Sequence, residues 1–275
     1  MQIIALQMDI AWEEPGANLA TIEAMVESAV PPSGSLILTP ELVDIGFSMN
    51  AGAARPAEYL AAASRLARRW KSWLCFGMVL DHELAIAHDA PCAVGTPHPA
   101  NTMVVVRPDG TTAGAYRKLQ PFGLGEETGT YSAGDKTLLV DCNGLCVSPL
   151  ICYDLRFPEL WRLAARAGAQ VMLIGASWPA KRAAHWRALT IARAIENQAI
   201  VVACNRVGRD PNHPYLGGSI AIGPDGAVLA ELGEAPGVMR VEATAAQVED
   251  YRRALPFLRD AEPARLGSIR VVRKA

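Results

Sequence analysis

The sequence predicts an α/β protein in which strands form mixed sheets covered by helices. Short apolar runs, typical of buried strands, alternate with segments of helical periodicity along most of the chain. Between them lie tight-turn signals such as Pro108-Asp109-Gly110, where proline sets φ at the second turn position and glycine accepts a positive φ. Because such hairpins join antiparallel strands within an alternating strand–helix pattern, the sheets are expected to be mixed.

The first hundred residues are expected to contain three buried strands and two helices. The apolar runs at 2–8, 35–39 and 73–80 predict the strands. An Ala/Arg-rich segment at 56–70 predicts one helix, and a stripe of apolar residues at helical spacing predicts the helix before it. That stripe consists of Leu19, Ile22, Met25, Val26 and Ala29. Residues 81–100 interrupt this rhythm and predict an irregular excursion.

Hairpins and further helices follow in the rest of the chain. The expected hairpins pair Asn101–Arg107 with Thr112–Tyr116, Thr137–Val140 with Leu145–Leu150, and Ser219–Ile222 with Ala227–Glu231. The other expected elements are strands at 171–176 and 200–204 and helices at 158–167 and 181–198. The segment 244–275 is expected to start as a short helix and then to become irregular.

Composition places the chain among globular proteins with a sizeable apolar core. Of its 275 residues, 51% are hydrophobic and 20% are charged, and no linker divides them, so one domain is expected over residues 1–275. The net charge is −2 and aromatic residues make up 6%, which gives no basis for a nucleic acid partner or an anionic membrane surface.

Cysteine usage and the first residues indicate a reducing, cytoplasmic setting. Six cysteines are too few for a disulfide scaffold in a chain of this length, so free thiols are expected. The opening MQIIALQMDI lacks the features of a signal peptide, and no apolar run reaches the roughly 18 residues of a membrane span. Cys142 and Cys146 lack the histidine or second cysteine pair that a zinc site needs, so neither a metal nor a cofactor is expected.

Three polar side chains follow the ends of predicted strands, a common place for catalytic groups. They are Glu41, Lys118 and Cys152, and each has an ordinary alternative: a solvated loop carboxylate, a surface cation and a buried structural thiol. In a functional site they would serve as a base, an oxyanion-stabilising ammonium and a nucleophile. A sharp turn into a helix would place Cys152 at the helix N-terminus, where the dipole would lower the pKa of the thiol.

The order and the local contexts of these three residues are more specific than any one of them. The segments LTPELVDIGF, GAYRKLQPFG and SPLICYDLRFPEL resemble the three contexts of the Glu-Lys-Cys triad of the nitrilase, or carbon–nitrogen hydrolase, superfamily. Further similar blocks extend over almost the whole chain: Asn101-Thr102, Ala176–Pro179, Ala194–Asn197, Ala203–Gly208 and Gly217–Ser219. The resemblance implies a four-layer α-β-β-α sandwich of two mixed sheets. It also implies a homodimer or higher homo-oligomer in which segment 244–275 packs on a partner subunit.

The same resemblance implies a role for each residue of the triad. Cys152 is expected to be the nucleophile that forms a thioester, and Glu41 the base that accepts its proton. Lys118 and the backbone N–H of Tyr153 are expected to stabilise the tetrahedral intermediate. A second glutamate that orients the lysine or the substrate is expected at Glu127 rather than at Glu126.

Other side chains near the nucleophile have expected supporting roles. The guanidinium of Arg156 suits the geometry of a substrate carboxylate. Asp154 has two local roles open to it, which are to cap the helix at 158–167 or to bind Arg156, and contact with the substrate is the alternative. Trp178 lies in one of the similar blocks and is expected to support the substrate-binding site.

The residues after the cysteine indicate an amidase. Cys-Tyr-Asp-Leu-Arg-Phe-Pro-Glu resembles amidase branches such as omega-amidase, whereas true nitrilases carry Trp-Glu after the cysteine. The expected reaction is hydrolysis of a small carboxamide to a carboxylic acid and ammonia, and the sequence leaves the amide open. Nitrile hydrolysis, N-carbamoyl hydrolysis and amide-forming acyl transfer remain alternatives on the same fold. A non-enzymatic scaffold is the alternative of another class, although an intact triad disfavours it. The excursion at 81–100 departs from the compact connection expected of an omega-amidase.

Overall fold

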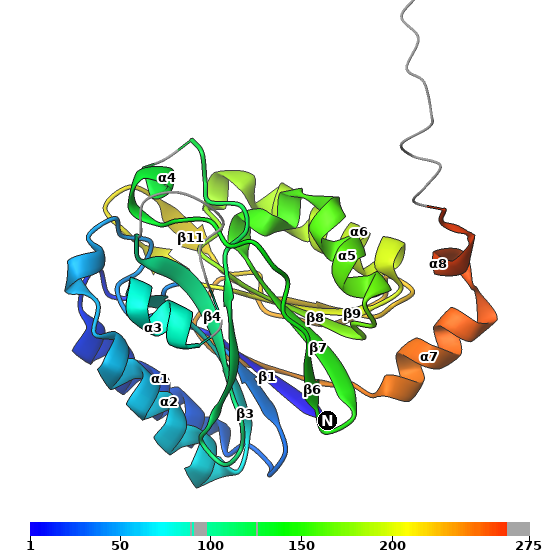
Figure 1. The fold of residues 1–275 in the computed structure, drawn as a ribbon, viewed down its shortest axis with the longest axis horizontal. Helices are drawn as coiled ribbons and strands as arrows, with labels where there is room; N and C mark the ends of the chain where they lie inside the picture. Colours follow the sequence, from blue (N-terminus) through cyan, green and yellow to red (C-terminus); the bar gives the residue numbers. More distant parts are fainter. Residues whose placement is uncertain (89, 91–97, 125, 263–275) are drawn as a thin grey trace, which may run out of the picture.

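Two six-stranded mixed sheets pack face to face and carry helices on their outer faces (Figure 1). The computed structural model describes residues 1–88, 90, 98–124 and 126–262. In spatial order, the first sheet consists of β14 (Gly237–Glu242), β1 (Gln2–Gln7), β2 (Leu36–Leu38), β3 (Trp73–Leu80), β4 (Ala100–Val106) and β5 (Thr112–Arg117). The second consists of β13 (Val228–Glu231), β12 (Ile220–Ile222), β9 (Ile200–Asn205), β8 (Val171–Ala176), β7 (Leu145–Ile151) and β6 (Val140–Cys142). The predicted four-layer sandwich is confirmed.

The helices form the two outer layers, and short elements fill the loops. Helices α1 (Pro15–Ala29) and α2 (Pro56–Trp70) cover the first sheet, and α5 (Pro158–Arg166) and α6 (Ala183–Asn197) cover the second (Figure 1). The shorter helices are α3 (His82–Ala87), α4 (Glu127–Thr130), α7 (Ala245–Ala254) and α8 (Phe257–Asp260), and β10 (Val207–Arg209) pairs with β11 (Pro214–Leu216). Single 3₁₀ turns lie at Ala51–Ala53, Cys152–Arg156 and Ala180–Arg182. No helix in the described ranges is both long and apolar enough to cross a membrane.

Strand alternation explains why β1 is apolar on both faces. Ile3 and Ala5 point into the core between the two sheets, whereas Ile4 and Leu6 point outward and pack beneath α1 and α2. A strand buried on both faces has no solvated side, so its sequence is a continuous apolar run rather than an alternating one. The run at 2–8 therefore predicted a strand correctly without indicating which residues face which layer.

Strand direction places several strand ends at one edge of the sandwich. Strands β2 and β3 are parallel, and β5 runs in the same direction as β3 because each is antiparallel to β4. In the second sheet, β7 and β8 are parallel as well. The sheets approach closely at this edge, since a Cβ added to Gly175 of β8 would lie 2.7 Å from the carbonyl oxygen of Thr39 behind β2.

Two sequence predictions need correction. Residues 82–87 form helix α3 rather than part of an irregular excursion, because the Asp81 side chain accepts a hydrogen bond from the Leu84 amide (2.8 Å) and caps the helix. The rest of the excursion at 89 and 91–97 lies outside the described residues. The strand before Asn143-Gly144 is Val140–Cys142, shifted toward the turn from the predicted Thr137–Val140.

The tail is described only to residue 262. Its helix α7 begins after Thr244, as expected, and Arg252 donates hydrogen bonds from it to the backbone oxygens of Ala169 (2.7 Å) and Gln198 (2.9 Å). The chain then leads away from the sheets through α8 (Figure 1). Packing of the segment 244–275 on a partner subunit stays a prediction, and residues 263–275 lie outside the described part.

We predict that Gly77→Ala destabilises the protein by about 1–3 kcal/mol, the usual cost of overpacking a core. A methyl group at Gly77 would collide with the carbonyl oxygen of Pro40 and would lie 3.1 Å from Cα of Glu41. Chemical denaturation measures the change, with Gly16→Ala as the control because nothing lies within 4 Å of the added Cβ there. Equal free energies of unfolding for the two variants would contradict the close approach.

Candidate active site

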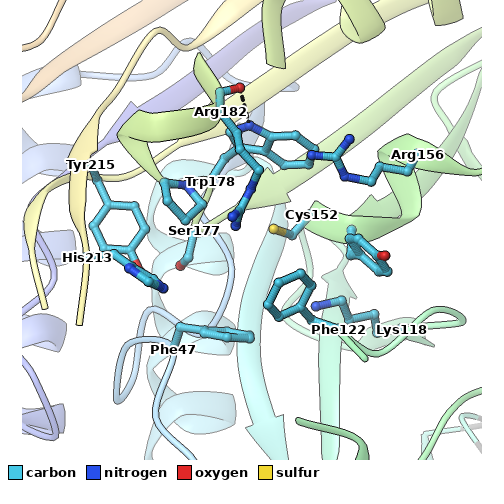
Figure 2. Close-up of a pocket in the computed structure, with 12 residues that line it drawn as sticks. Phe47, Lys118, Phe122, Cys152, Arg156, Ser177, Trp178, Arg182, His213 and Tyr215 are labelled. Atoms are coloured by element: carbon cyan, nitrogen blue, oxygen red, sulfur yellow. Dashed lines mark hydrogen bonds between the residues drawn. The ribbon is translucent and has the colours of Figure 1, made fainter. Parts of the chain in front are cut away.

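A small cavity opens at the edge where the strand ends meet. Its volume is about 30 Å³, so the lining side chains lie close together around it. Figure 2 shows its aromatic and cationic walls, with the sulfur of Cys152 directed into the enclosed space. The lining residues are Phe47, Lys118, Phe122, Cys152, Tyr153, Arg156, Ser177, Trp178, Pro179, Arg182, His213 and Tyr215. Three of the four supporting residues expected from the sequence, Tyr153, Arg156 and Trp178, therefore line one cavity together with Lys118 and Cys152, whereas Glu127 does not.

Cys152 sits on a sharp turn between β7 and a 3₁₀ turn. Its φ is +41°, a left-handed conformation that β-carbon-bearing residues adopt rarely and that marks a constrained site. The side chain is 8% exposed and belongs to the core between the sheets, yet its sulfur reaches the cavity (Figure 2). This sharp turn ends the strand and directs the Cys152 thiol into the cavity.

The expected lowering of the thiol pKa is wrong. Burial raises the pKa of Cys152 well above its ordinary value, and the Glu41 carboxylate raises it further, while Lys118 only partly opposes them. The helix-dipole argument fails because the turn after Cys152 is a 3₁₀ segment of five residues, Cys152–Arg156, before α5 begins at Pro158. At neutral pH the resting group is therefore the neutral thiol, and it needs a nearby base to become a nucleophile.

Lys118 is a buried cation and not a surface residue. It follows β5 directly, is 1% exposed, and donates hydrogen bonds from Nζ to Glu41 Oε1 (2.8 Å) and to both carboxylate oxygens of Glu127 (2.9 and 2.8 Å). Burial by itself lowers the pKa of the ammonium, but the carboxylates of Glu127 and Glu41 outweigh it, so the pKa lies above its ordinary value. Lys118 is therefore a permanently charged ammonium held between two carboxylates.

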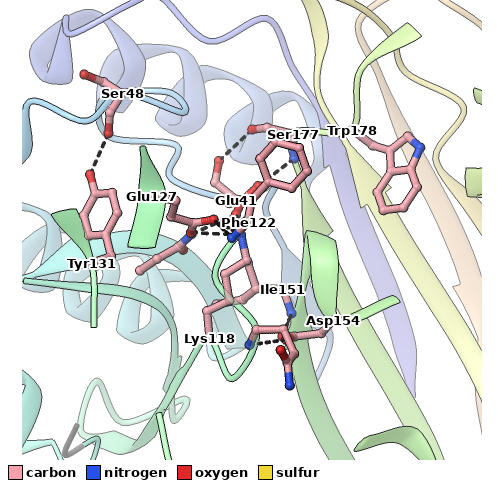
Figure 3. A network of polar contacts seen from close by, with 12 residues as sticks. Glu41, Ser48, Lys118, Phe122, Glu127, Tyr131, Ile151, Asp154, Ser177 and Trp178 are labelled. Atoms are coloured by element: carbon pink, nitrogen blue, oxygen red, sulfur yellow. Dashed lines mark hydrogen bonds and ion pairs between the residues drawn. The ribbon is translucent and has the colours of Figure 1, made fainter. Parts of the chain in front are cut away.

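Glu41 is fully buried, so the alternative of a solvated loop carboxylate is wrong. Besides the Lys118 ammonium, its Oε1 accepts a hydrogen bond from Asn101 Nδ2 (2.8 Å), and its Oε2 accepts one from the backbone N–H of Ser177 (3.0 Å). Figure 3 shows these groups converging from different segments. Glu41 follows β2 of the first sheet, and Ser177 follows β8 of the second. The Glu41 carboxylate therefore links the two sheets at this edge.

The structure distinguishes the two adjacent glutamates. Glu127 is fully buried at the start of α4, whereas Glu126 is exposed and faces an outer cavity. Besides Lys118, the Glu127 carboxylate accepts hydrogen bonds from Asn101 Nδ2 (2.9 Å) and from the backbone N–H of Phe122 (2.6 Å) (Figure 3). Glu127 thus holds Lys118 and also fixes the segment that carries Phe122 of the cavity wall.

Comparison with known proteins now adds to this geometry. The sequence profile described as "Carbon-nitrogen hydrolase" matches residues 3–253. The chain belongs to the carbon–nitrogen hydrolase family. This hydrolase is 34% identical to the 2-oxoglutaramate amidase of Bacillus subtilis, over 94% of this chain and 96% of that protein. It is 33% identical to the omega-amidase YafV of Escherichia coli, over 97% and 98% of the two chains.

A solved structure shares the overall fold of this chain. A mutant of the amidase from Nesterenkonia sp. AN1, which shows Michael addition of acrylamide at the active-site cysteine, superposes with a TM-score of 0.76. The two chains are 26% identical, and the match covers 93% of this chain and 98% of that one. The predicted membership of an omega-amidase-like branch and the prediction of a carbon–nitrogen hydrolase enzyme are confirmed.

Asp154 of this hydrolase has neither of its predicted local roles. Its carboxylate accepts hydrogen bonds from the backbone N–H groups of Ile151 (3.0 Å) and Gln120 (2.9 Å) and from the Tyr116 hydroxyl (2.8 Å). The helix α5 instead begins after Phe157, without a side-chain cap. Arg156 lies over the ring of Trp178, with its guanidinium carbon 4.8 Å from the ring centroid.

Two guanidinium groups give the cavity a cationic wall. Arg156 stacks on Trp178 and approaches His185, with Nη2 to Nδ1 at 3.3 Å, and Arg182 lies 5.4 Å from the centroid of Phe122. Within the described ranges, neither guanidinium forms an ion pair with a carboxylate. Cation–π contacts hold each group in place without neutralising its charge.

Sequence reasoning missed several residues of the site. Asn101 entered only as part of a similar block, although its amide bridges the two carboxylates. Phe47 entered only as the last residue of the similar segment LTPELVDIGF, and Arg182 was predicted only as part of the helix at 181–198. His213 and Tyr215 lie at β11, whose three residues are too few to show strand alternation. In the described part of the chain, no group of three His, Cys, Asp or Glu side chains has the arrangement of a metal site.

We predict that Glu127→Gln lowers kcat by about 100-fold, the scale of a misplaced catalytic group, because a neutral amide cannot hold the Lys118 ammonium from both oxygens. The matched control is Glu126→Gln, which removes an exposed carboxylate and should change kcat by less than about twofold. Steady-state ammonia release measures both. A larger loss in Glu126→Gln than in Glu127→Gln would reverse the assignment.

Proposed function

We propose that this hydrolase cleaves a small carboxamide to a carboxylic acid and ammonia through a thioester at Cys152. The observation that carries the proposal is the cavity itself, in which the Cys152 sulfur and the Lys118 ammonium face one enclosed space. Behind it, the ammonium is held by two buried carboxylates, Glu41 and Glu127. The amidase relatives support the reaction class. Every step uses only side chains, backbone amides and water.

The first half of the reaction forms the thioester. The Cys152 sulfur attacks the amide carbonyl carbon and its proton passes to the Glu41 carboxylate, which is the reason why a thiol with a raised pKa is compatible with catalysis. The C=O bond becomes a C–O⁻ single bond. When the intermediate collapses, the C–N bond breaks, and the nitrogen takes the proton from Glu41 and leaves as ammonia.

The negative charge that develops on the carbonyl oxygen needs a positive charge at a fixed position beside it. The Lys118 ammonium supplies it, and because its position is set by Glu41 and Glu127, no reorganisation is needed during the reaction. The backbone N–H of Tyr153, directly after the constrained residue Cys152, is the second expected donor. Glu127 is a positioning residue in this account, since it acts through Lys118.

The second half of the reaction returns the enzyme to its starting state. Glu41, again unprotonated, takes a proton from a water molecule while the hydroxide attacks the thioester carbonyl. The C–S bond then breaks, the sulfur regains the proton from Glu41, and the carboxylic acid leaves. One carboxylate serves both halves, and the hydrogen bonds from Lys118, Asn101 and Ser177 hold it in one position for both.

The cationic wall indicates the class of amide. Arg156 and Arg182 line the cavity with their charges uncompensated by carboxylates of the described residues, so we propose that the substrate carries a carboxylate beside its amide. Trp178 supports this subsite by stacking on Arg156. Assays with nitriles and N-carbamoyl compounds test whether the enzyme instead catalyses one of the alternative reactions of the same fold.

We predict that the enzyme releases ammonia from amides with a terminal carboxylate and that Cys152→Ala abolishes the release. Intact-mass spectrometry should show an acyl adduct on the wild-type protein during turnover, and none on the variant, because the thioester needs the sulfur. Cys75→Ala, at a fully buried thiol in the core, is the control for loss of a cysteine.

Three results would contradict this proposal. They are ammonia release by Cys152→Ala at the wild-type rate, an acyl adduct mapped to another residue, and turnover of nitriles or N-carbamoyl compounds with none of amides. The last result would move the reaction to an alternative of the same fold while keeping the nucleophile.

We further predict that Arg156→Gln raises KM for a carboxylate-bearing amide by about 10–100-fold, the value of a charged hydrogen bond, and leaves KM for a neutral amide of equal length unchanged. Arg187→Gln is the matched control, because Arg187 pairs with Glu231 on the exposed surface. Parallel kinetics on the two amides measure the effect. An equal rise in KM for both amides would show that Arg156 does not select for the carboxylate.

A further inference from the structure

We propose that Asp154 is a positioning residue that holds the strand end carrying Lys118 and the turn carrying Cys152 at a fixed separation. The inference rests on the proposed function, because it concerns the relative placement of the nucleophile and the ammonium. Asp154 does not line the cavity, so it acts through the residues that do. Its carboxylate is fully buried.

The contacts of Asp154 lie on both sides of Lys118. The Tyr116 hydroxyl, two residues before Lys118, donates to Oδ2 (2.8 Å), and the Gln120 backbone N–H, two residues after it, donates to Oδ1 (2.9 Å). Figure 3 shows Asp154 beside the Lys118 segment. A single carboxylate therefore fixes this segment from both directions, one contact coming from a side chain and the other from the backbone.

The same carboxylate also fixes the Cys152 turn. Asp154 itself lies within the 3₁₀ turn Cys152–Arg156, and its Oδ2 accepts the backbone N–H of Ile151 (3.0 Å), the residue before Cys152 (Figure 3). The turn is anchored further by its own backbone, since Trp161 Nε1 donates to the Asp154 carbonyl oxygen (3.0 Å). The backbone is therefore fixed on both sides of Cys152, at Ile151 before it and at Asp154 after it.

These contacts cross from one sheet to the other. The Lys118 segment ends β5, at the edge of the first sheet, and the Cys152 turn ends β7 of the second. A change in how the sheets pack would alter the distance between ammonium and sulfur directly. Displacing reacting groups by about 1 Å is enough to cost roughly 100-fold in rate, so a buried link at this point has a catalytic consequence.

A carboxylate is the side chain that suits this position. It offers two oxygens that accept all three donors at once, whereas asparagine would turn an NH₂ group toward one of the backbone N–H donors. Burial raises the pKa of Asp154 to about 7, opposed by the Lys118 charge and by the hydrogen bonds it accepts. A costly buried carboxylate is retained where an amide of the same shape could not make the same contacts.

The test compares Asp154→Asn with the wild type in two measurements. Steady-state kinetics on the preferred amide should show kcat reduced about 10- to 100-fold with KM within about twofold, because the cavity walls keep their residues while the reacting groups shift. Alkylation of Cys152 by iodoacetamide, followed by peptide mass spectrometry, should slow by a similar factor. A merely structural role would lower the melting temperature and leave kcat of the folded enzyme and the alkylation rate unchanged, and that result would overturn the proposal.

A second pair of variants keeps the proposal testable if Asp154→Asn does not fold. Tyr116→Phe removes one of the three contacts and should lower kcat by about two- to fivefold with KM unchanged. Tyr59→Phe is its matched control, because Tyr59 is also buried and donates its hydroxyl to a backbone oxygen, that of Pro15 (2.6 Å), away from the cavity. Equal kcat values for the two variants would overturn the proposal.

The two readouts separate this inference from the proposed function. If the wild type hydrolyses no amide, the kinetic arm fails and the function is wrong, whereas the alkylation rate of Cys152 still measures its placement. If the wild type is active but both Asp154→Asn and Tyr116→Phe match it in kcat and in alkylation rate, the function stands and the positioning role of Asp154 is wrong.

Discussion

A buried ammonium ion between two buried carboxylates is the constraint on which the site depends. Removing Lys118, Glu41 and Glu127 from water is costly, and their mutual contacts offset that cost together with the hydrogen bonds that the carboxylates accept. Loss of one partner of such a buried pair typically costs about 3–5 kcal/mol, because an uncompensated charge remains. The three charges sum to −1, and the Asn101 amide donates to both carboxylates, which distributes that excess. The side chains are therefore held in one arrangement before any substrate binds.

The sandwich makes this arrangement possible from distant segments. The charged cluster comes from the segments that follow β2 and β5 and from the start of α4, and the thiol follows β7 in the other sheet. Parallel strand directions bring these ends to one edge, and close contacts such as that of Gly77 with Pro40 leave the loops little freedom. An aromatic and cationic wall then closes over the reacting groups and selects which amide can enter.

The sequence predicted the layers and the chemistry better than the electrostatics. Apolar strands and paired turn signals were enough to predict mixed sheets covered by helices, because burial on both faces leaves a continuous pattern. The arrangement of two sheets in four layers came from the family resemblance. The triad residues followed from their order and contexts. The direction of the Cys152 pKa shift could not be predicted from the sequence, because it depends on burial and on Glu41, which only the folded chain brings near the thiol. Asp154 was misassigned for the same reason, since all the partners of its carboxylate but Ile151 lie more than thirty residues away. Three-residue strands such as β11 carry no readable period.

The most direct test of the central claim is a crystal structure of Cys152→Ala with a carboxylate-bearing amide bound in the cavity. The account predicts the carbonyl carbon about 3–3.5 Å from the position of the missing sulfur, the carbonyl oxygen within hydrogen-bonding distance of Lys118 Nζ, and the Glu41–Lys118–Glu127 contacts unchanged. An amide bound with its carbonyl turned away from Lys118, or a Lys118 side chain released from the two carboxylates, would contradict it.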